Sequence, residues 1–219
     1  MKGSPIRPPV AISLCILFAV AFAIVATAIV RNMIGGFDRA IIDAVQGWEA
    51  PRLTSLMQVF TAIGGTKVVM LLIVAVTAFL LLGLRARGQA YFFFFATIGT
   101  GVLNQIVKFI FKRARPEFHR LAEAVGYSFP SGHTMMSFSL YALFTYLLWG
   151  HIRSTVGRVI LVIFSFFMFG MIAVSRIYLG VHYPSDILGG VFASAFWLTL
   201  SALLFEQFQM QRKRSLVQQ

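Results

Sequence analysis

The chain has 219 residues, of which 58% are hydrophobic and only 12% are charged. A soluble domain carries about 25% charged residues, so this composition excludes a water-soluble globule and predicts an integral membrane protein. The formal net charge of +12 would suggest nucleic-acid binding in a soluble protein. Here the basic residues stand between apolar segments, where membrane orientation and anionic headgroups explain them better. We therefore expect the lipid bilayer as a partner, no nucleic acid and no obligatory protein partner.

Six segments are apolar enough to cross a bilayer, which takes about 20 helical residues. They cover residues 10–30, 53–84, 89–111, 134–149, 156–175 and 187–205. No alternating strand pattern is present, and only helices or closed barrels satisfy the backbone in lipid. The predicted fold is all-α: a single domain over residues 1–219, forming a bundle of six transmembrane helices with short cytoplasmic tails at 1–9 and 207–219.

Two segments depart from a simple span. The second is longer than one crossing and contains Gly64 and Gly65 followed by Lys67, so its first part is expected to include an interfacial turn. In the first link, residues 31–52, apolar residues recur at helical spacing with charged residues interleaved. The apolar positions are Phe37, Ile41, Ala44, Val45 and Trp48, and the charged ones are Asp38, Arg39 and Asp43. This pattern predicts an amphipathic helix in the membrane interface, in the first outer link.

An even number of spans puts both termini on one side of the membrane. Basic residues in both tails and in the second and fourth links form a consistent cytoplasmic set: Lys2, Arg7, Arg85, Arg87, Arg153, Arg158, Arg212, Lys213 and Arg214. The opposite links are also basic, so a charge count alone does not orient the chain. If several of the basic residues in those opposite links belong to the active site and do not set the topology, the termini are cytoplasmic and the site lies on the outer face of the cell membrane.

Three polar clusters fall in the third and fifth links, on one side of the predicted bundle. Residues 108–116 read K-F-I-F-K-R-A-R-P, residues 130–133 read P-S-G-H, and residues 175–186 read S-R-I-Y-L-G-V-H-Y-P-S-D. Charged residues at a membrane boundary are expensive and usually functional. We expect these three clusters to form one site.

Local patterns suggest how the clusters are arranged. Lys108 and Arg115 share a helix face if the third helix continues to Ala114. Ser131 is suited to N-cap the following helix, and Gly132 would let a ligand approach the free backbone amides there, which form an anion site. Pro184 suits a first helical turn, which would allow Asp186 to reach back to His182.

These residues together match the chemistry of a phosphate group. Arg115 and Arg176 offer planar forks and Lys108 a point charge to phosphate oxygens. Two histidines, His133 and His182, can divide the work, one attacking phosphorus and one protonating the leaving oxygen. No two carboxylates in these clusters have metal-ligand spacing, so we expect neither a metal nor another cofactor.

The pattern Lys108-x6-Arg115-Pro116, Pro130-Ser131-Gly132-His133 and Ser175-Arg176-x5-His182-x3-Asp186 resembles the three-part signature of the type 2 phosphatidic acid phosphatase family. The resemblance covers about a third of the chain and implies a six-helix membrane enzyme that dephosphorylates lipids without metal. By this resemblance His182 is the nucleophile that forms a phosphohistidine, Asp186 orients it, and His133 is the general acid. The phosphate ligands would be Lys108, Arg115, Ser131, Gly132 and Arg176. The chain looks most like the bacterial type-B phosphatidylglycerophosphate phosphatases and their undecaprenyl pyrophosphate phosphatase relatives.

Two other functions remain open. A lipid phosphotransferase would use the same site with a second acceptor, and a lipid transporter or scramblase would line a headgroup path with these cations. The sequence does not choose among phosphatidylglycerol phosphate, phosphatidate, diacylglycerol pyrophosphate and undecaprenyl pyrophosphate. Lys67, Lys112 and Arg113 are interpreted as interfacial or headgroup-attracting charges. His119 and His151 are interpreted as solvated link residues.

Overall fold

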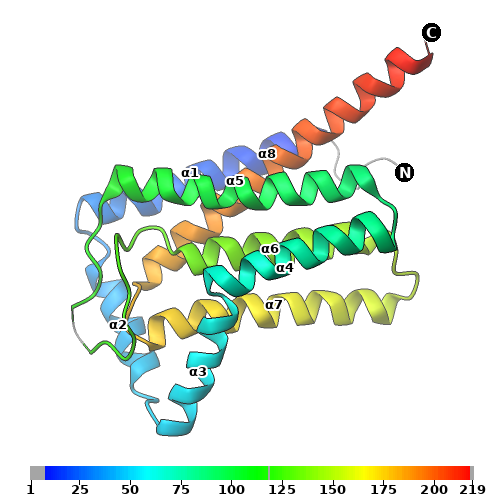
Figure 1. The fold of residues 1–219 in the computed structure, drawn as a ribbon. Coiled ribbons are helices and arrows are strands. Elements are labelled where there is room, and N and C mark those ends of the chain that lie inside the picture. The colour runs from blue at the N-terminus through cyan, green and yellow to red at the C-terminus, as the bar shows by residue number, and fades with distance from the viewer. Residues whose placement is uncertain (1–7, 118, 218–219) are drawn as a thin grey trace.

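The computed structural model describes residues 8–117 and 119–217, with side chains described as far as residue 211. All regular structure in these residues is helical. The elements are α1 (Pro8–Val30), α2 (Gly35–Gln46), α3 (Pro51–Ile63), α4 (Thr66–Ala78), η1 (Phe79–Gly83), α5 (Arg87–Phe111), α6 (Gly132–Trp149), α7 (Thr155–Tyr178) and α8 (Pro184–Val217). Figure 1 shows α4, α5, α6 and α7 running back and forth along one direction, with α8 oblique to them and α2 and α3 at one end. The all-helical fold is therefore as predicted.

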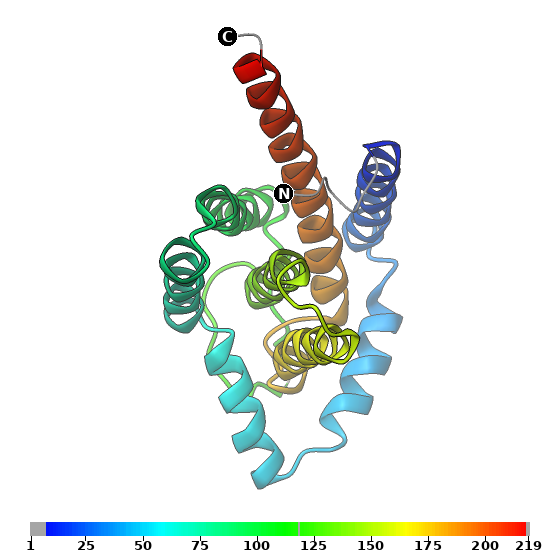
Figure 2. The same ribbon diagram turned by 90° about the vertical axis from the view of Figure 1, so that its right-hand side faces the viewer.

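Five helices of the described chain are long and apolar enough to cross a membrane: Pro8–Val30, Thr66–Gly83, Arg87–Phe111, Thr155–Tyr178 and Pro184–Gln211. The predicted fourth span, α6, is not among them. Buried hydroxyls such as Ser137 and Ser139 lower its hydropathy, and α6 lies at the centre of the bundle in Figure 2, surrounded by the other long helices. A helix shielded from lipid by its neighbours does not need an apolar surface. The count of six spans stays a prediction.

The second predicted segment divides at its two glycines. Gly64 ends α3, and Gly65 is the N-cap of α4. A β-carbon on Gly64 would stand 2.5 Å from Ile172 Cγ2 and 3.3 Å from His133 Cδ2. Only glycine lets the chain turn this close to α6 and α7. The turn expected in this segment is thus present, and the candidate span in this segment is α4 continued by η1, Thr66–Gly83.

The helix predicted in the first link is present as α2, but its buried face differs from the predicted apolar one. Asp38 and Ile42 are its buried residues, whereas Trp48, just beyond its end, is 74% exposed. Asp38 is buried because it has partners in the link between α7 and α8, described below. The interfacial position of α2 stays a prediction.

The third predicted helix does not continue to Ala114, as a helix face shared by Lys108 and Arg115 would require. α5 ends at Phe111, and Lys112 follows in a left-handed conformation with φ 45°. Arg115 therefore shares no helix face with Lys108 and approaches the bundle from the loop. By contrast, the Ser131 N-cap of α6 and the start of α8 at Pro184 are as predicted.

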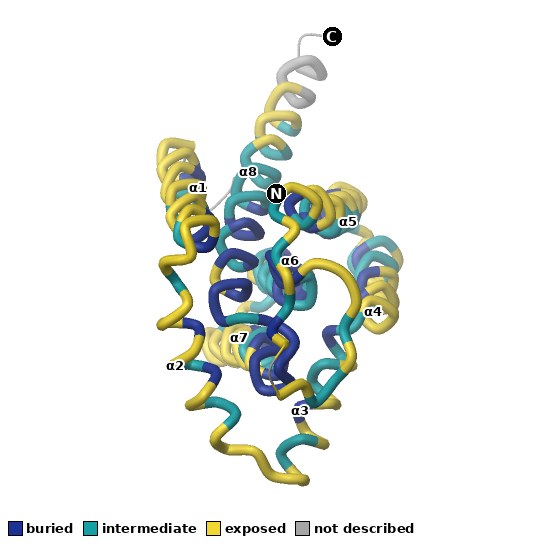
Figure 3. The backbone as a smooth tube through the Cα atoms, turned by 90° about the vertical axis from the view of Figure 1, so that its left-hand side faces the viewer, coloured by how far each residue is buried: buried dark blue, intermediate teal, exposed yellow. Residues whose placement is uncertain are grey.

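The three polar clusters meet at one end of the bundle, at the left in Figure 1. Figure 3 views that end directly: buried chain at the ends of α6, α7 and α8 is encircled by the exposed outer helices. The apolar core lies between α4, α5, α6 and α8 and includes Ile73, Leu80, Phe93 and Leu140. This core fixes the helix ends from which the polar side chains project.

Candidate active site

His182 and Asp186 form a buried pair at the start of α8. Pro184 begins the helix, so Asp186 lies in its first turn and His182 in the link immediately before it. His182 Nδ1 is 3.2 Å from Asp186 Oδ2, and the two side chains are 2% and 0% exposed. The same oxygen accepts hydrogen bonds from the Tyr183 amide, at 2.9 Å, and from the Ser128 hydroxyl. These donors fix the carboxylate that faces the imidazole.

The partners of His182 select one tautomer. Arg115 Nη1 lies 3.1 Å from His182 Nε2, and a guanidinium can only donate. Nε2 is therefore the acceptor, and Nδ1 carries the proton that it donates to Asp186. Burial lowers the pKa of His182 to about 4, an effect that the hydrogen bond and charge of Asp186 oppose. Near pH 7 the ring is neutral and Nε2 is unprotonated, as a nucleophile requires, with its lone pair accepting from Arg115.

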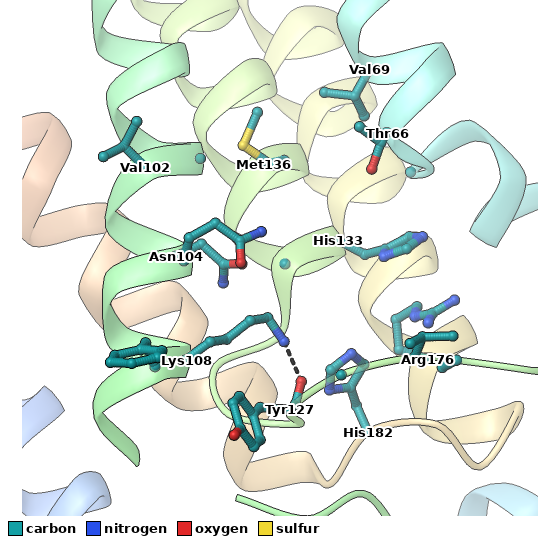
Figure 4. Close-up of a pocket in the computed structure, with 18 of the residues that line it drawn as sticks. Thr66, Val69, Val102, Asn104, Lys108, Tyr127, His133, Met136, Arg176 and His182 are labelled. Atoms are coloured by element: carbon teal, nitrogen blue, oxygen red, sulfur yellow. Dashed lines mark hydrogen bonds between the residues drawn. The ribbon is translucent and has the colours of Figure 1, made fainter. Parts of the chain in front are cut away.

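Three cations line the same cavity, which has a volume of about 1190 Å³. Lys108 comes from the last turn of α5 and Arg176 from the last turn of α7. Arg115 is held by the carbonyls of Val181, at 2.8 Å, and Gly126, at 2.9 Å. Burial lowers the pKa of Arg115, but a guanidinium stays charged in proteins. Figure 4 shows Lys108, Arg176 and His182 around one space.

Arg176 carries an unusual donor. The residue is 6% exposed, and its side chain donates to the Thr61 hydroxyl. Its Nε is the single buried side-chain nitrogen or oxygen without a hydrogen-bond partner among the described residues. An unpaired buried donor is costly, and such a cost is typical of a ligand-binding position. An anionic ligand in this cavity would relieve it.

The start of α6 contributes His133 to the cavity (Figure 4). Ser131 caps the helix, accepting from the Thr134 amide at 3.4 Å and from the Thr134 hydroxyl at 2.9 Å. Ser131 is fully buried and is not among the cavity-lining residues, so its predicted contact with phosphate stays a prediction. Gly132 does line the cavity, and a β-carbon there would stand 3.1 Å from Asn104 Oδ1.

The structure thus brings together seven of the eight predicted site residues. Five charged or imidazole side chains line the cavity: Lys108, Arg115, His133, Arg176 and His182. Gly132 lies beside them, and Asp186 lies behind His182.

The structure also corrects one interpretation. Arg113 is not a headgroup-attracting charge: its guanidinium donates to Asp186 and Asp38 and is 16% exposed. Lys67 and Lys112 are exposed and outside the cavity.

Other site residues carried no signal in the sequence. Ser128 bonds to Asp186 across 58 residues, and Thr61 meets Arg176 across 115. Neither hydroxyl stands out by charge or periodicity. His119, expected to be solvated, is 57% exposed and also pairs with Glu49 at 2.5 Å. His151 bonds to Gln89 at 3.3 Å.

Two known proteins are similar to this chain in sequence. The Bacillus subtilis protein Phosphatidylglycerophosphatase B is 31% identical over 171 residues, covering 77% of this chain and 83% of its own. The Rhizobium johnstonii Lipid A 1-phosphatase is 29% identical over 138 residues, covering 55% of this chain and 52% of its own.

Two solved structures are also similar. The first is a transmembrane PAP2-type phosphatidylglycerolphosphate phosphatase from Bacillus subtilis, with a TM-score of 0.79 and 27% identity over 90% of this chain and 96% of its own. The second, Aquifex aeolicus LpxE, shares the fold with a TM-score of 0.58 and 23% identity over 74% of this chain and 92% of its own. Residues 89–210, more than half of the sequence and all three polar clusters, match the PAP2 superfamily, and the chain belongs to that family.

Proposed function

We propose that the protein is a metal-independent phosphatase of membrane lipid phosphates or pyrophosphates. The observation that carries this proposal is the placing of His182 Nε2 and three cations around one cavity at the end of an apolar bundle. Lys108, Arg115 and Arg176 supply the positive charge that a metal supplies in other phosphatases. Among the described residues no group of three or more His, Cys, Asp or Glu side chains could hold a metal ion.

The reaction would proceed in two steps. His182 Nε2 forms a bond to phosphorus while the bond from phosphorus to the leaving oxygen breaks, and His133 donates a proton to that oxygen. Water then attacks the phosphohistidine, His133 accepts a proton from it, and the bond between nitrogen and phosphorus breaks to release phosphate. Throughout, Asp186 accepts the Nδ1 hydrogen bond and stabilises the positive ring. The cations stabilise charge on the phosphoryl oxygens.

The shape of the cavity supports a lipid substrate. From the cations it extends between α4 and α5 along apolar side chains that include Val69, Met70, Val102 and Phe109. Figure 4 shows Val69 and Val102 on facing sides, farther along the bundle than His182. A phosphate could thus sit among the cations while its apolar tail lies along the helices. The similarity to Phosphatidylglycerophosphatase B makes phosphatidylglycerol phosphate our first candidate. Phosphatidate and undecaprenyl pyrophosphate carry the same combination of groups.

We further propose that both termini are cytoplasmic and that the site is on the outer face. Support comes from the arrangement in Figure 1, where the start of α1 and the end of α8 lie at the end of the bundle opposite the polar clusters. The links α4–α5 and α6–α7, which contain Arg85 and Arg153, lie at that same end. Basic residues favour the cytoplasmic side.

The experiment is phosphate release by the purified protein from phosphatidylglycerol phosphate, phosphatidate and undecaprenyl pyrophosphate, with excess EDTA throughout. We expect release in EDTA from at least one lipid and none from His182→Ala. Phosphate appearing on a second lipid or a sugar would identify a phosphotransferase. Lipid flux without phosphate release would identify a transporter, and release that requires added magnesium would overturn the proposed mechanism.

A further inference from the structure

A buried series of charges leads away from the pair of His182 and Asp186. One carboxylate oxygen of Asp186, Oδ2, faces His182, whereas the other, Oδ1, accepts from Arg113 Nη1 at 2.7 Å. The second terminal nitrogen of Arg113, Nη2, donates to Asp38 Oδ2 at 2.8 Å. The side chains of Arg113 and Asp38 are 16% and 3% exposed. The α2 helix is thereby connected to the predicted nucleophile through three ionised side chains.

Ser185 contacts both Asp38 and Arg113 and so belongs to the same network. Its amide donates to Asp38 Oδ1 at 2.8 Å and its hydroxyl to Asp38 Oδ2 at 2.7 Å. Arg113 Nη1 is also 2.7 Å from the Ser185 hydroxyl, and the guanidinium lies 4.0 Å from the centre of the Tyr183 ring. Both carboxylate oxygens of Asp38 and both terminal nitrogens of Arg113 are therefore engaged. A planar fork is needed to span two carboxylates in this way.

We propose that Arg113 is a positioning residue for the phosphatase reaction, holding Asp186 in line with His182 and itself held by Asp38 of α2. This inference rests on the proposed function, in which His182 attacks phosphorus. Arg113 does not line the substrate cavity, so it acts through Asp186. Arg113 holds Oδ1, whereas Ser128 and the Tyr183 amide hold Oδ2, so these donors together keep Oδ2 directed at Nδ1.

The network also sets the charge around His182. The charged and titratable groups facing His182 and Asp186 are Arg113 and Arg115 (the loop after α5), Lys108 (α5), Arg176 (α7), His133 (α6), Tyr183 (the link before α8) and, through Arg113, Asp38 (α2). Removing the positive charge of Arg113 favours proton binding by the pair. Removing the negative charge of Asp38 disfavours it. The acidic limb of the pH–rate profile should therefore move in opposite directions in the two variants.

The experiment compares Arg113→Gln, Asp38→Asn and the double variant, with phosphate release measured in EDTA from pH 4 to 8. Two controls change the same charges outside the network. Lys112→Gln alters the exposed neighbour of Arg113, and Asp43→Asn alters an α2 carboxylate that is 62% exposed and paired with Arg39. The substrate titrates identically in all variants, so differences between profiles report on the protein.

For Arg113→Gln we expect kcat to fall about 10- to 100-fold, the size of loss seen when outer-shell hydrogen-bond partners of metal-ligating histidines are removed, with KM nearly unchanged and the acidic limb at higher pH. For Asp38→Asn we expect a smaller fall in kcat and an acidic limb of the pH–rate profile at lower pH. Since both changes act through Asp186, the double variant should lose no more kcat than Arg113→Gln alone. Its limb should lie near that of the wild type. The controls should retain the wild-type kcat and limb.

The double variant preserves the net charge of the network, so it provides the test if Arg113→Gln alone does not fold. Wild-type kcat and limb in the folded variants would overturn the inference and leave the proposed function intact. Limbs that move in the same direction would also overturn it, because they would indicate general loosening instead of an effect of charge. Absence of phosphate release from the wild type, by contrast, would overturn the proposed function itself.

Discussion

At the scale of single residues, the two histidines differ in their surroundings. His182 has a fixed tautomer because Arg115 occupies Nε2 and Asp186 faces Nδ1. His133 lies at the start of α6, on the cavity wall, and the structure gives it no carboxylate partner among the described residues. A carboxylate on Nδ1 stabilises positive charge on the ring, which suits the proposed nucleophile because a phosphorylated imidazole is positively charged. His133 is the second imidazole in the cavity, and its proposed role is proton transfer to the leaving oxygen.

This difference predicts separate losses of activity. His182→Ala should be inactive on every substrate, because no substrate bypasses the attack on phosphorus. His133→Ala should slow phosphatidate hydrolysis roughly 10²–10⁴-fold, since a lipid alcohol is a poor leaving group. It should lose far less on an aryl phosphate or a pyrophosphate. Turnover of both variants on the three substrates checks this; equal losses for His133→Ala on all three would mean that His133 binds phosphate and donates no proton.

The burial of neutral His182 predicts a pH dependence of stability. Its pKa is lowered from 6.5 to about 4, so between these values the unfolded chain binds a proton that the folded protein does not. Stability contributed by the neutral ring is therefore present above pH 6.5 and lost as the pH falls towards 4. Melting temperatures in detergent should decline across this range more steeply for the wild type than for His182→Gln. Parallel curves for the two proteins would contradict this assignment.

At the scale of elements, the sequence predicts which segments are helical but not how their faces are used. Hydropathy located α1, α5, α7 and α8, and residue types alone predicted the break after α3, the Ser131 cap of α6 and the start of α8 at Pro184. The burial of Asp38 could not be predicted, because its partners lie 75 and 147 residues away in the chain. Local periodicity instead favoured an apolar face around Phe37 and Trp48. Long-range ion pairs leave no local pattern in a sequence.

The glycine break between α3 and α4 gives a prediction at this scale. Gly64→Ala would place a β-carbon 2.5 Å from Ile172 Cγ2 and 3.3 Å from His133 Cδ2. The resulting shift of His133 should reduce kcat by up to about 100-fold, since small misplacements of reacting groups are costly. Gly36→Ala is the matched control, because a β-carbon there meets nothing within 4 Å. Equal activity of the two variants would show that the turn does not position His133.

At the scale of the whole molecule, the arrangement of the helices brings together clusters that are far apart in the sequence. The three polar links were predicted to meet because alternate links of a membrane bundle share a side, and the structure places them at one end (Figure 1). The predicted fourth span, α6, is less apolar than the five helices that are long and apolar enough to cross a membrane in the described chain, and its crossing stays a prediction. The sequence also left the direction of the bundle in the membrane open, since basic residues occur at both ends.

Direction is testable with single cysteines in a Cys15→Ser background. Glu117→Cys lies at the end of the bundle with the polar clusters and should react with an impermeant thiol reagent in intact cells. Gly88→Cys lies at the opposite end, at the start of α5, and should react only after the membrane is permeabilised. The reverse labelling would place the active site in the cytoplasm.

The central claim is that His182 becomes covalently phosphorylated during turnover without metal. The direct measurement is rapid quenching of the purified protein with ³²P-labelled phosphatidylglycerol phosphate or phosphatidate in excess EDTA, followed by denaturation at alkaline pH. We predict label on the wild-type chain that is stable in alkali, lost in acid and absent from His182→Ala. Phosphate release at the wild-type rate without any labelled protein, or label that persists in His182→Ala, would contradict this account.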